Sequence, residues 1–121
     1  MLLGLRTVIY PAPDLEKAKA WYTLALGFGP YFDEPFYVGY SVQGFELGLV
    51  PDATPSADGA QALWGVGSVG PALEHLTSIG GSILEPITEV GGGIKVAAVL
   101  DPFGNRFGII ENPNFAFEQL P

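Results

Sequence analysis

The sequence predicts an α+β fold made of two β-α-β-β-β modules, one over about residues 1–55 and one over about residues 56–121. Strand-like and helix-like segments follow one another in the same order in both halves of the chain. The two helical patterns align when Leu15 is placed on Val69. Late in the chain, the turn residues 101–105 (Asp-Pro-Phe-Gly-Asn) separate two apolar runs and predict a β-hairpin.

The first module starts with a strand expected over Arg6–Tyr10, which ends because Pro11 and Pro13 cannot donate ladder hydrogen bonds. Asp14 is a suitable N-cap for the helix that follows, and Gly27 can end that helix. Helical spacing places four apolar residues on one face: Ala18, Trp21, Tyr22 and Ala25. Three β-rich runs, separated by turns at Asp33-Glu34-Pro35 and Gln43-Gly44, complete the module: Phe28–Phe32, Phe36–Val42 and Phe45–Val50.

The second module follows a polar connection of small residues, Pro51–Gly59. A strand is expected over Ala60–Val66, then a helix that Ser68 caps and that Gly80-Gly81 ends. Three more strands are expected over Ser82–Val90, Ile94–Leu100 and Arg106–Glu111. The glycines 91–93 predict a hairpin tip, because they lead into a strand and lack the residues of a phosphate loop.

Composition indicates one packed globular domain over residues 1–121, because 48% of the residues are hydrophobic and only 15% are charged. The net charge of −8 and the scarcity of basic residues argue against nucleic acid as a partner. No apolar run is long enough to span a membrane, and the first five residues lack the features of a signal peptide, so a cytoplasmic location is expected. An acidic surface attracts cationic small molecules, although it is also an ordinary means of solubility.

Two stretches of the chain together resemble the vicinal oxygen chelate superfamily, which includes glyoxalase I, bleomycin-resistance proteins and extradiol dioxygenases. One stretch is the helix start at Pro13-Asp14-Leu15 with Trp21-Tyr22 and Leu26-Gly27, and the other is the hairpin region 100–113. The resemblance implies that the two modules form a cupped mixed sheet around a cavity. Many members are homodimers, and short sheets with exposed edge strands need a partner, so a homodimer is expected.

The resemblance also implies a metal position in the cup, with one ligand from the first and one from the last strand of each module. Spacing from the shared motifs assigns these four positions to Thr7, Glu46, Gln61 and Gly108. Only Glu46 and Gln61 are credible ligands, and a catalytic divalent site generally needs three protein donors. We therefore expect no cofactor, or at most a weakly bound divalent ion at Glu46 and Gln61. Glu111 is expected to face the other side of its strand.

The same four positions suggest room for an organic ligand, because Gly108 has no side chain and Thr7 has a small one. Tyr37 and Tyr40 are an odd number of residues apart, so only one of them faces the cup. Aromatic residues at such a site can stack on a planar ligand. The candidate ligand-binding residues are Thr7, Tyr40, Gln61, Trp64, Phe103 and Gly108.

Other motifs are weaker. Residues 65–70 match the dinucleotide fingerprint Gly-x-Gly-x-x-Gly, but the chain has too few helices for a doubly wound sheet, and a plain strand-to-helix turn is expected. No Gly-x-Ser-x-Gly elbow is present and His75 is the only histidine, so triad hydrolysis is not expected.

These observations favour a protein that binds a small organic molecule in its cup without a strongly held metal, with Glu46 as the main polar group. The alternative is an enzyme of the glyoxalase or dioxygenase type. In such an enzyme Glu46 is the catalytic residue, either as a general base whose pKa is raised by burial or with a weakly held ion. A third interpretation is a structural or protein-binding role. Under the simplest interpretation, Glu46 is only a carboxylate hydrogen-bonded to its neighbours.

Overall fold

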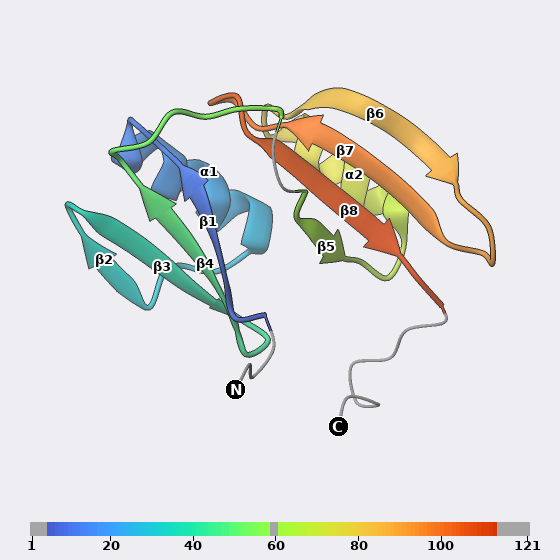
Figure 1. Ribbon diagram of the computed structural model, residues 1–121, viewed down its shortest axis with the longest axis horizontal. Coiled ribbons are helices and arrows are strands. Elements are labelled where there is room, and N and C mark those ends of the chain that lie inside the picture. Colours follow the sequence, from blue (N-terminus) through green and yellow to red (C-terminus); the bar gives the residue numbers. More distant parts are fainter. Residues whose placement is uncertain (1–4, 59–60, 114–121) are drawn as a thin grey trace. The chain divides into compact units, whose positions relative to one another are not determined.

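The computed structural model describes residues 5–58 and 61–113 of the chain (Figure 1). The first four residues and residues 59–60 lie outside this part, and with them the expectations for the N-terminal segment, the end of the linker and the start of the first strand of module two. The chain divides into two compact units, Met1–Ser56 and Ala57–Pro121. In its described residues, each unit contains one four-stranded mixed sheet and one helix.

Unit 1 contains five elements: β1 (Thr7–Pro11), α1 (Leu15–Leu26), β2 (Phe32–Glu34), β3 (Tyr37–Val42) and β4 (Phe45–Val50). Its strands have the spatial order β1-β4-β3-β2. β1 is parallel to β4, whereas the other neighbouring pairs are antiparallel. α1 covers one face of this sheet (Figure 1). The opposite face of the sheet carries the residues discussed below.

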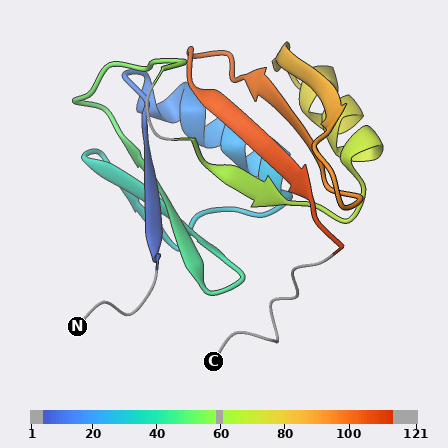
Figure 2. The ribbon, with the colours of Figure 1, turned by 45° about the vertical axis from the view of Figure 1, so that its right-hand side comes forward.

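Unit 2 repeats this arrangement with β5 (Leu63–Gly65), α2 (Val69–Ser78), β6 (Ser82–Glu89), β7 (Lys95–Leu100) and β8 (Arg106–Glu111). The spatial order is β5-β8-β7-β6, and the only parallel pair among these described strands is β5 with β8. α2 packs on β7 and β8 (Figures 1 and 2). The predicted α+β class and the repeated β-α-β-β-β order are confirmed.

Two predicted boundaries are wrong. Asp33 and Glu34, expected in a turn, belong to β2 because they pair with Val38 and Tyr37 of β3. The turn lies at residues 35–36 instead, and residues 28–31 form no strand. β5 is also shorter than expected among the described residues, since it covers only three residues. In both cases the pairing partner, which local composition does not reveal, decided the boundary.

The N-terminus of α1 is capped by a neighbouring residue in the sequence, whereas that of α2 is capped by a residue from another strand. Asp14 accepts a hydrogen bond from the Lys17 backbone N–H, and Gly27 ends α1 at a φ of 87°. Ser68 is at the N-cap of α2 but makes no side-chain cap bond there. Glu111 supplies the acceptor instead, because its Oε1 lies 2.9 Å from the Val69 backbone N. Glu111 therefore faces α2, as its strand position predicts.

The core of unit 1 lies between α1 and the sheet. α1 buries one apolar face, Ala18, Trp21 and Tyr22. The sheet contributes fully buried residues to the same layer: Val38, Tyr40, Leu47 and Leu49. Burying each large side chain of this kind stabilises the fold by roughly 1.5–3 kcal/mol. The face of the unit 1 sheet that contacts α1 therefore forms the core of this unit.

The turn at residues 101–105 is a hydrogen-bonded structural feature. Asp101 is only 4% exposed, and its carboxylate accepts bonds from the Phe103 and Asn105 backbone N–H groups at 2.9 and 2.8 Å. It also accepts a bond from Asn105 Nδ2 at 3.0 Å. Gly104 has a φ of 100°, which favours glycine. This motif therefore positions β7 and β8 rather than carrying chemistry.

The remaining glycine-rich motifs are also structural. Residues 65–70 connect β5 to α2. Because β5 belongs to a mixed sheet and not to a doubly wound parallel sheet, these residues form a plain strand-to-helix turn, as expected. The three glycines 91–93 all have positive φ and close the hairpin between β6 and β7, as predicted. No helix in the described part of the chain is long and apolar enough to cross a membrane.

Candidate functional site

The face of the unit 1 sheet opposite α1 carries the polar candidates. Strand register places Thr7 beside Glu46 and Ile9 beside Gly48. Side chains alternate along a strand, so these residues point away from the face that packs on α1. Ile9 is 54% exposed on this side. We call this side of the unit 1 sheet, opposite α1, the open face of unit 1.

Glu46 is the centre of a hydroxyl cluster on the open face. Thr7 Oγ1 donates to Glu46 Oε1 at 3.1 Å. The Tyr31 hydroxyl donates to Glu46 Oε2. The Tyr37 hydroxyl also interacts with this carboxylate, which lowers the pKa of Glu46 and raises that of Tyr37. Three neutral hydroxyl groups from separate segments of the chain therefore converge on one carboxylate.

Two glycines make room for the tyrosine rings. A Cβ on Gly39 would lie 3.0 Å from Glu46 Oε2 and 3.1 Å from the Tyr37 ring. A Cβ on Gly48 would lie 2.7 Å from Tyr37 Cζ. Glycine at these neighbouring positions on β3 and β4 lets the Tyr37 ring lie flat against the sheet and reach Glu46.

These contacts shift the pKa values of the cluster. The Tyr31 hydrogen bond is the largest influence on Glu46 and lowers its pKa from 4.5; Tyr37 and Thr7 act in the same direction, and burial opposes them. Burial, followed by the bond to Glu46, raises the pKa of Tyr37 to about 12. The bond to Glu46 also raises the pKa of Tyr31. At neutral pH the carboxylate is ionised and both phenols keep their protons.

Tyr40 does not lie on the open face, and Tyr37 takes the place expected for it. Tyr40 is fully buried on the α1 side, where its hydroxyl donates to the Lys19 backbone carbonyl at 2.9 Å. Its oxygen also lies 3.0 Å from Thr23 Oγ1. The expectation that Tyr40 faces a ligand is therefore corrected, because β3 pairs with β4 in a register that puts Tyr40 opposite Leu47.

The residues predicted in unit 2 do not gather into one site. Gly108 pairs with Leu63 rather than with Gln61, which is exposed and precedes β5. A Cβ on Gly108 would lie 2.7 Å from Leu63 Cδ2, so the Leu63 side chain fills the space expected above this glycine. The expectation of room for a ligand at Gly108 is therefore wrong.

The two predicted aromatic residues of unit 2 also have structural surroundings. Trp64 stacks on Phe107 with ring centroids 5.3 Å apart and an interplanar angle of 4°. Both share the face of Ile109, which is buried and lies on the α2 side. Phe103 belongs to the turn after β7 and donates its backbone N–H to Asp101.

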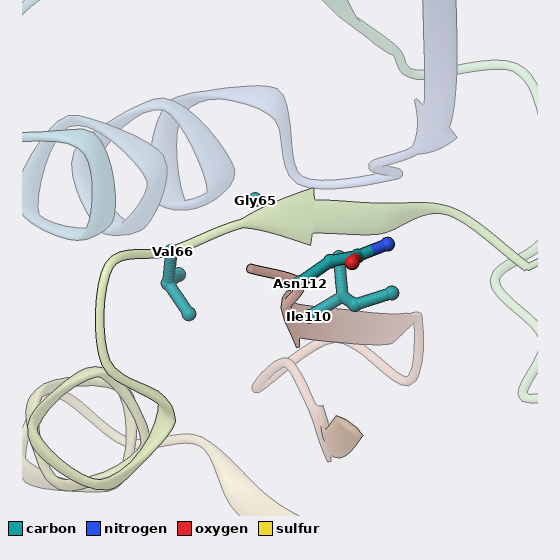
Figure 3. A pocket seen from close by; sticks show the side chains of 4 residues that line it. All are labelled: Gly65, Val66, Ile110 and Asn112. Atoms are coloured by element: carbon teal, nitrogen blue, oxygen red, sulfur yellow. The ribbon is translucent and has the colours of Figure 1, made fainter. Parts of the chain in front are cut away.

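A hollow of about 380 Å³ lies where β5 and β8 end in unit 2. Figure 3 shows its lining residues: Gly65, Val66, Ile110 and Asn112. None of these side chains titrates or acts as a nucleophile. These four residues give the hollow a surface for contact but no acid or base.

An ion pair between a largely buried arginine and a half-exposed glutamate lies on the same face of the unit 2 sheet as Gly108. Arg106 Nη2 contacts Glu85 Oε1 at 2.7 Å, and the Arg106 side chain is only 13% exposed. Arg106 Nε is buried without a hydrogen-bond partner. The register puts Glu85 opposite Ala98 and Arg106 opposite Leu100, so the pair spans β7. Unit 2 therefore fills this face with its own side chains.

The residues at the four family positions do not fit a tightly held divalent ion. Thr7 donates its hydroxyl hydrogen to Glu46, and both oxygens of Glu46 already accept hydrogen bonds. Gly108 offers no donor atom, and Leu63 covers it. Within residues 5–58 and 61–113, no three His, Cys, Asp or Glu side chains form a group that could hold a metal. A catalytic ion needs about three protein donors.

The sequence singles out Glu46 and Thr7, which the structure brings into contact, but it gives no signal for Tyr31 and selects Tyr40 rather than Tyr37 on β3. A signal for Tyr37 was present. A two-residue turn at Gln43-Gly44 sets the register of β3 on β4, which places Ser41 opposite Glu46 and hence Tyr37 on the same face. Tyr31 lies outside any strand, so periodicity gives no information about it.

The lowered pKa of Glu46 predicts an acid-dependent contribution to stability. Because its pKa is lower in the folded state, this contribution is present above about pH 4.5 and is lost as the pH falls through the folded value. We expect the unfolding free energy of Glu46→Gln to fall less steeply below pH 4.5 than that of the wild type, as measured by urea denaturation. Glu74→Gln, which alters an exposed carboxylate on α2, serves as a control. Identical acid dependence of wild type and Glu46→Gln would refute the prediction.

Comparison with known proteins agrees with this architecture. A glyoxalase-related enzyme from Fulvimarina pelagi has a TM-score of 0.77 and 25% identity, over 93% of this chain and 90% of its own. A superfamily member from Sphaerobacter thermophilus has a TM-score of 0.76 and 21% identity, over 93% of this chain and 99% of its own. TioX from Micromonospora sp. ML1 has a TM-score of 0.71 and 17% identity, over 90% of this chain and 98% of its own.

The sequence comparisons complete this result. No curated protein matches the chain. The family model of the Glyoxalase/Bleomycin resistance protein/Dioxygenase superfamily matches residues 4–109. This match covers most of both units, and the solved structures share their fold. The chain therefore belongs to the glyoxalase/bleomycin resistance protein/dioxygenase superfamily.

Proposed function

We propose that the protein binds a small organic molecule on the open face of unit 1, without a tightly held metal ion. The observation that carries this proposal is the Glu46 cluster, in which Thr7, Tyr31 and Tyr37 hold one carboxylate among exposed apolar side chains. Ligand sites combine apolar surface with a few fixed polar groups. The proposed partner is a small molecule, with neither nucleic acid nor membrane involved.

The second candidate is a lyase, isomerase or dioxygenase-like enzyme that uses Glu46 as a base. The geometry supports it less well. A general base works best with a pKa near the working pH, whereas the hydrogen bonds to Glu46 lower its pKa. Binding therefore ranks before catalysis.

Location and assembly are part of the same proposal. We expect the protein to be located in the cytoplasm. We also expect a homodimer, because each sheet has edge strands whose backbone groups need pairing or cover. In unit 1 these edge strands are β1 and β2. A measurement of mass in solution tests the expected homodimer.

Native mass spectrometry of gently purified protein, with metal analysis of the same sample, tests the proposed function. We expect a dimer that carries an organic ligand and less than one divalent ion per chain. Glu46→Gln is expected to lower ligand occupancy at least about fivefold, because it removes the charge at the centre of the site. The charge-matched control Glu74→Gln, on the exposed side of α2, is expected to keep wild-type occupancy.

Two results would contradict the proposal. One divalent ion per chain that is lost in Glu46→Gln would move the metal-dependent enzyme to first place. Equal ligand occupancy in Glu46→Gln and Glu74→Gln would show that the ligand binds elsewhere.

A further inference from the structure

The hydroxyl cluster around Glu46 presents mainly hydrogen-bond acceptors, because the Thr7 and Tyr31 hydrogens are already engaged. Each hydroxyl group has a single hydrogen. Thr7 and Tyr31 direct theirs to the Glu46 carboxylate, and Tyr37 bonds to the same group. What remains available to a ligand is the lone pairs of two phenol oxygens and one carboxylate. A ligand that offers only acceptors, such as a carboxylate or phosphate, finds neither the Thr7 nor the Tyr31 hydrogen available and also meets the negative charge of Glu46.

The negative charge of the cluster has no basic partner. Among the described residues, no lysine or arginine side chain is hydrogen-bonded or ion-paired to Glu46. The groups that shift its pKa are hydroxyls and burial, and none is a cation. Lys19 on α1 forms its ion pairs with Asp33 and Glu16.

A second carboxylate increases this charge. Glu34 on β2 pairs with Tyr37 on β3, so both side chains point to the open face of unit 1. Glu34 is exposed. The open face therefore carries two acidic groups, and a positive ligand would meet attraction from both.

Exposed aromatic rings lie beside the cluster. The Phe32 ring centroid is 6.0 Å from that of Tyr37 and 6.5 Å from that of Tyr31, with interplanar angles of 63° and 56°. Tyr31 is 64% exposed and Phe32 is 38% exposed. Phe36, 67% exposed, extends the group with a centroid 6.1 Å from Phe32. Rings of this kind attract a cation through their electron-rich faces and cover an apolar body.

We propose that the open face of unit 1 selects an organic ammonium ion with an aromatic or apolar body. Its N–H groups donate to the phenol oxygens of Tyr31 and Tyr37 and to the remaining lone pairs of Glu46. Its apolar body packs on Phe32 and Phe36. This inference rests on the proposed function, since it names the ligand class of the same site.

Three small probes of similar size test the inference: benzylammonium, benzyl alcohol and benzoate, titrated into the whole protein by NMR or calorimetry. We expect benzylammonium to bind about tenfold more tightly than benzyl alcohol, and benzoate to bind most weakly. Glu46→Gln is expected to remove the preference for benzylammonium over benzyl alcohol. Phe32→Ala is expected to weaken the binding of both probes. Glu74→Gln is expected to leave all three affinities unchanged, because Glu74 lies on α2 in unit 2 and not on the unit 1 sheet.

The outcomes separate the ligand class from the proposed function. Equal binding of benzyl alcohol and benzylammonium, weakened by Phe32→Ala, would overturn the ammonium class and leave small-molecule binding standing. Tighter binding of benzoate would do the same. If none of the probes binds, or if binding is unaffected by both Glu46→Gln and Phe32→Ala, the open face is not a site for such molecules and both proposals fail.

Discussion

Replacement of Asp101 by alanine is expected to lower the free energy of unfolding by about 3 kcal/mol. The variant loses the acceptor for three hydrogen bonds, two from backbone N–H groups of Phe103 and Asn105 and one from the Asn105 side chain. Asp101 and Asn105 are almost fully buried, at 4% and 3% exposure. Donors left unpaired at such a place cost more than exposed ones, because water does not replace the lost acceptor. Urea denaturation measures the change.

Two further variants give this prediction its control. Asp101→Asn keeps an oxygen acceptor but brings an amide nitrogen near the Asn105 amide, so we expect an intermediate loss. Asp52→Ala removes a carboxylate from an exposed turn and is expected to change stability by less than about 0.5 kcal/mol. If Asp101→Ala were no less stable than Asp52→Ala, the turn would not have the structural role assigned to it.

Gly48→Ala is expected to displace Tyr37 from Glu46 and to destabilise the protein by about 1–3 kcal/mol. The new Cβ would lie 2.7 Å from Tyr37 Cζ and 2.9 Å from Cε1, too close for any real contact. The ring must therefore leave the sheet surface. Released from burial and from its bond to Glu46, Tyr37 is expected to titrate below its value of about 12, toward the ordinary value of 10.

Alkaline spectrophotometric titration of the tyrosines measures this shift. Tyr37→Phe identifies which part of the wild-type curve belongs to Tyr37. Gly29→Ala is the matched control, because a Cβ there meets nothing within 4 Å. The prediction fails if Gly48→Ala and Gly29→Ala give the same titration curve and the same stability.

The two halves of the chain use their sheets differently, although they repeat one topology. In unit 1 the face opposite the helix is polar at its centre and lined by exposed rings. In unit 2 the corresponding face is filled, by Leu63 over Gly108 and by the Arg106–Glu85 ion pair across β7. The two units thus share one topology, while the side chains on this face differ, so within residues 5–58 and 61–113 the candidate site lies in unit 1.

Local chemistry in the sequence determined the order of elements and several of their ends. Asp14 and Gly27 delimit α1 because capping acts within a few residues. The Gln43-Gly44 turn, with φ values of 51° and 85°, joins β3 to β4 for the same reason. Glu46 stood out because a carboxylate interrupts an apolar strand, and the departure of Gly108 from a metal-ligand pattern was visible from spacing alone.

Only the tertiary structure decided which groups surround Glu46. Tyr31, Tyr37 and Thr7 come from separate segments, and strand pairing brings them to one carboxylate. Pairing of β3 with β4 places Tyr40 in the core, and pairing of β5 with β8 places Leu63 over Gly108. Contacts of this kind depend on register between distant segments, which changes by a whole face when the pairing shifts by one residue. Local sequence therefore determines the order of the helices and strands, whereas strand pairing determines which side chains surround Glu46.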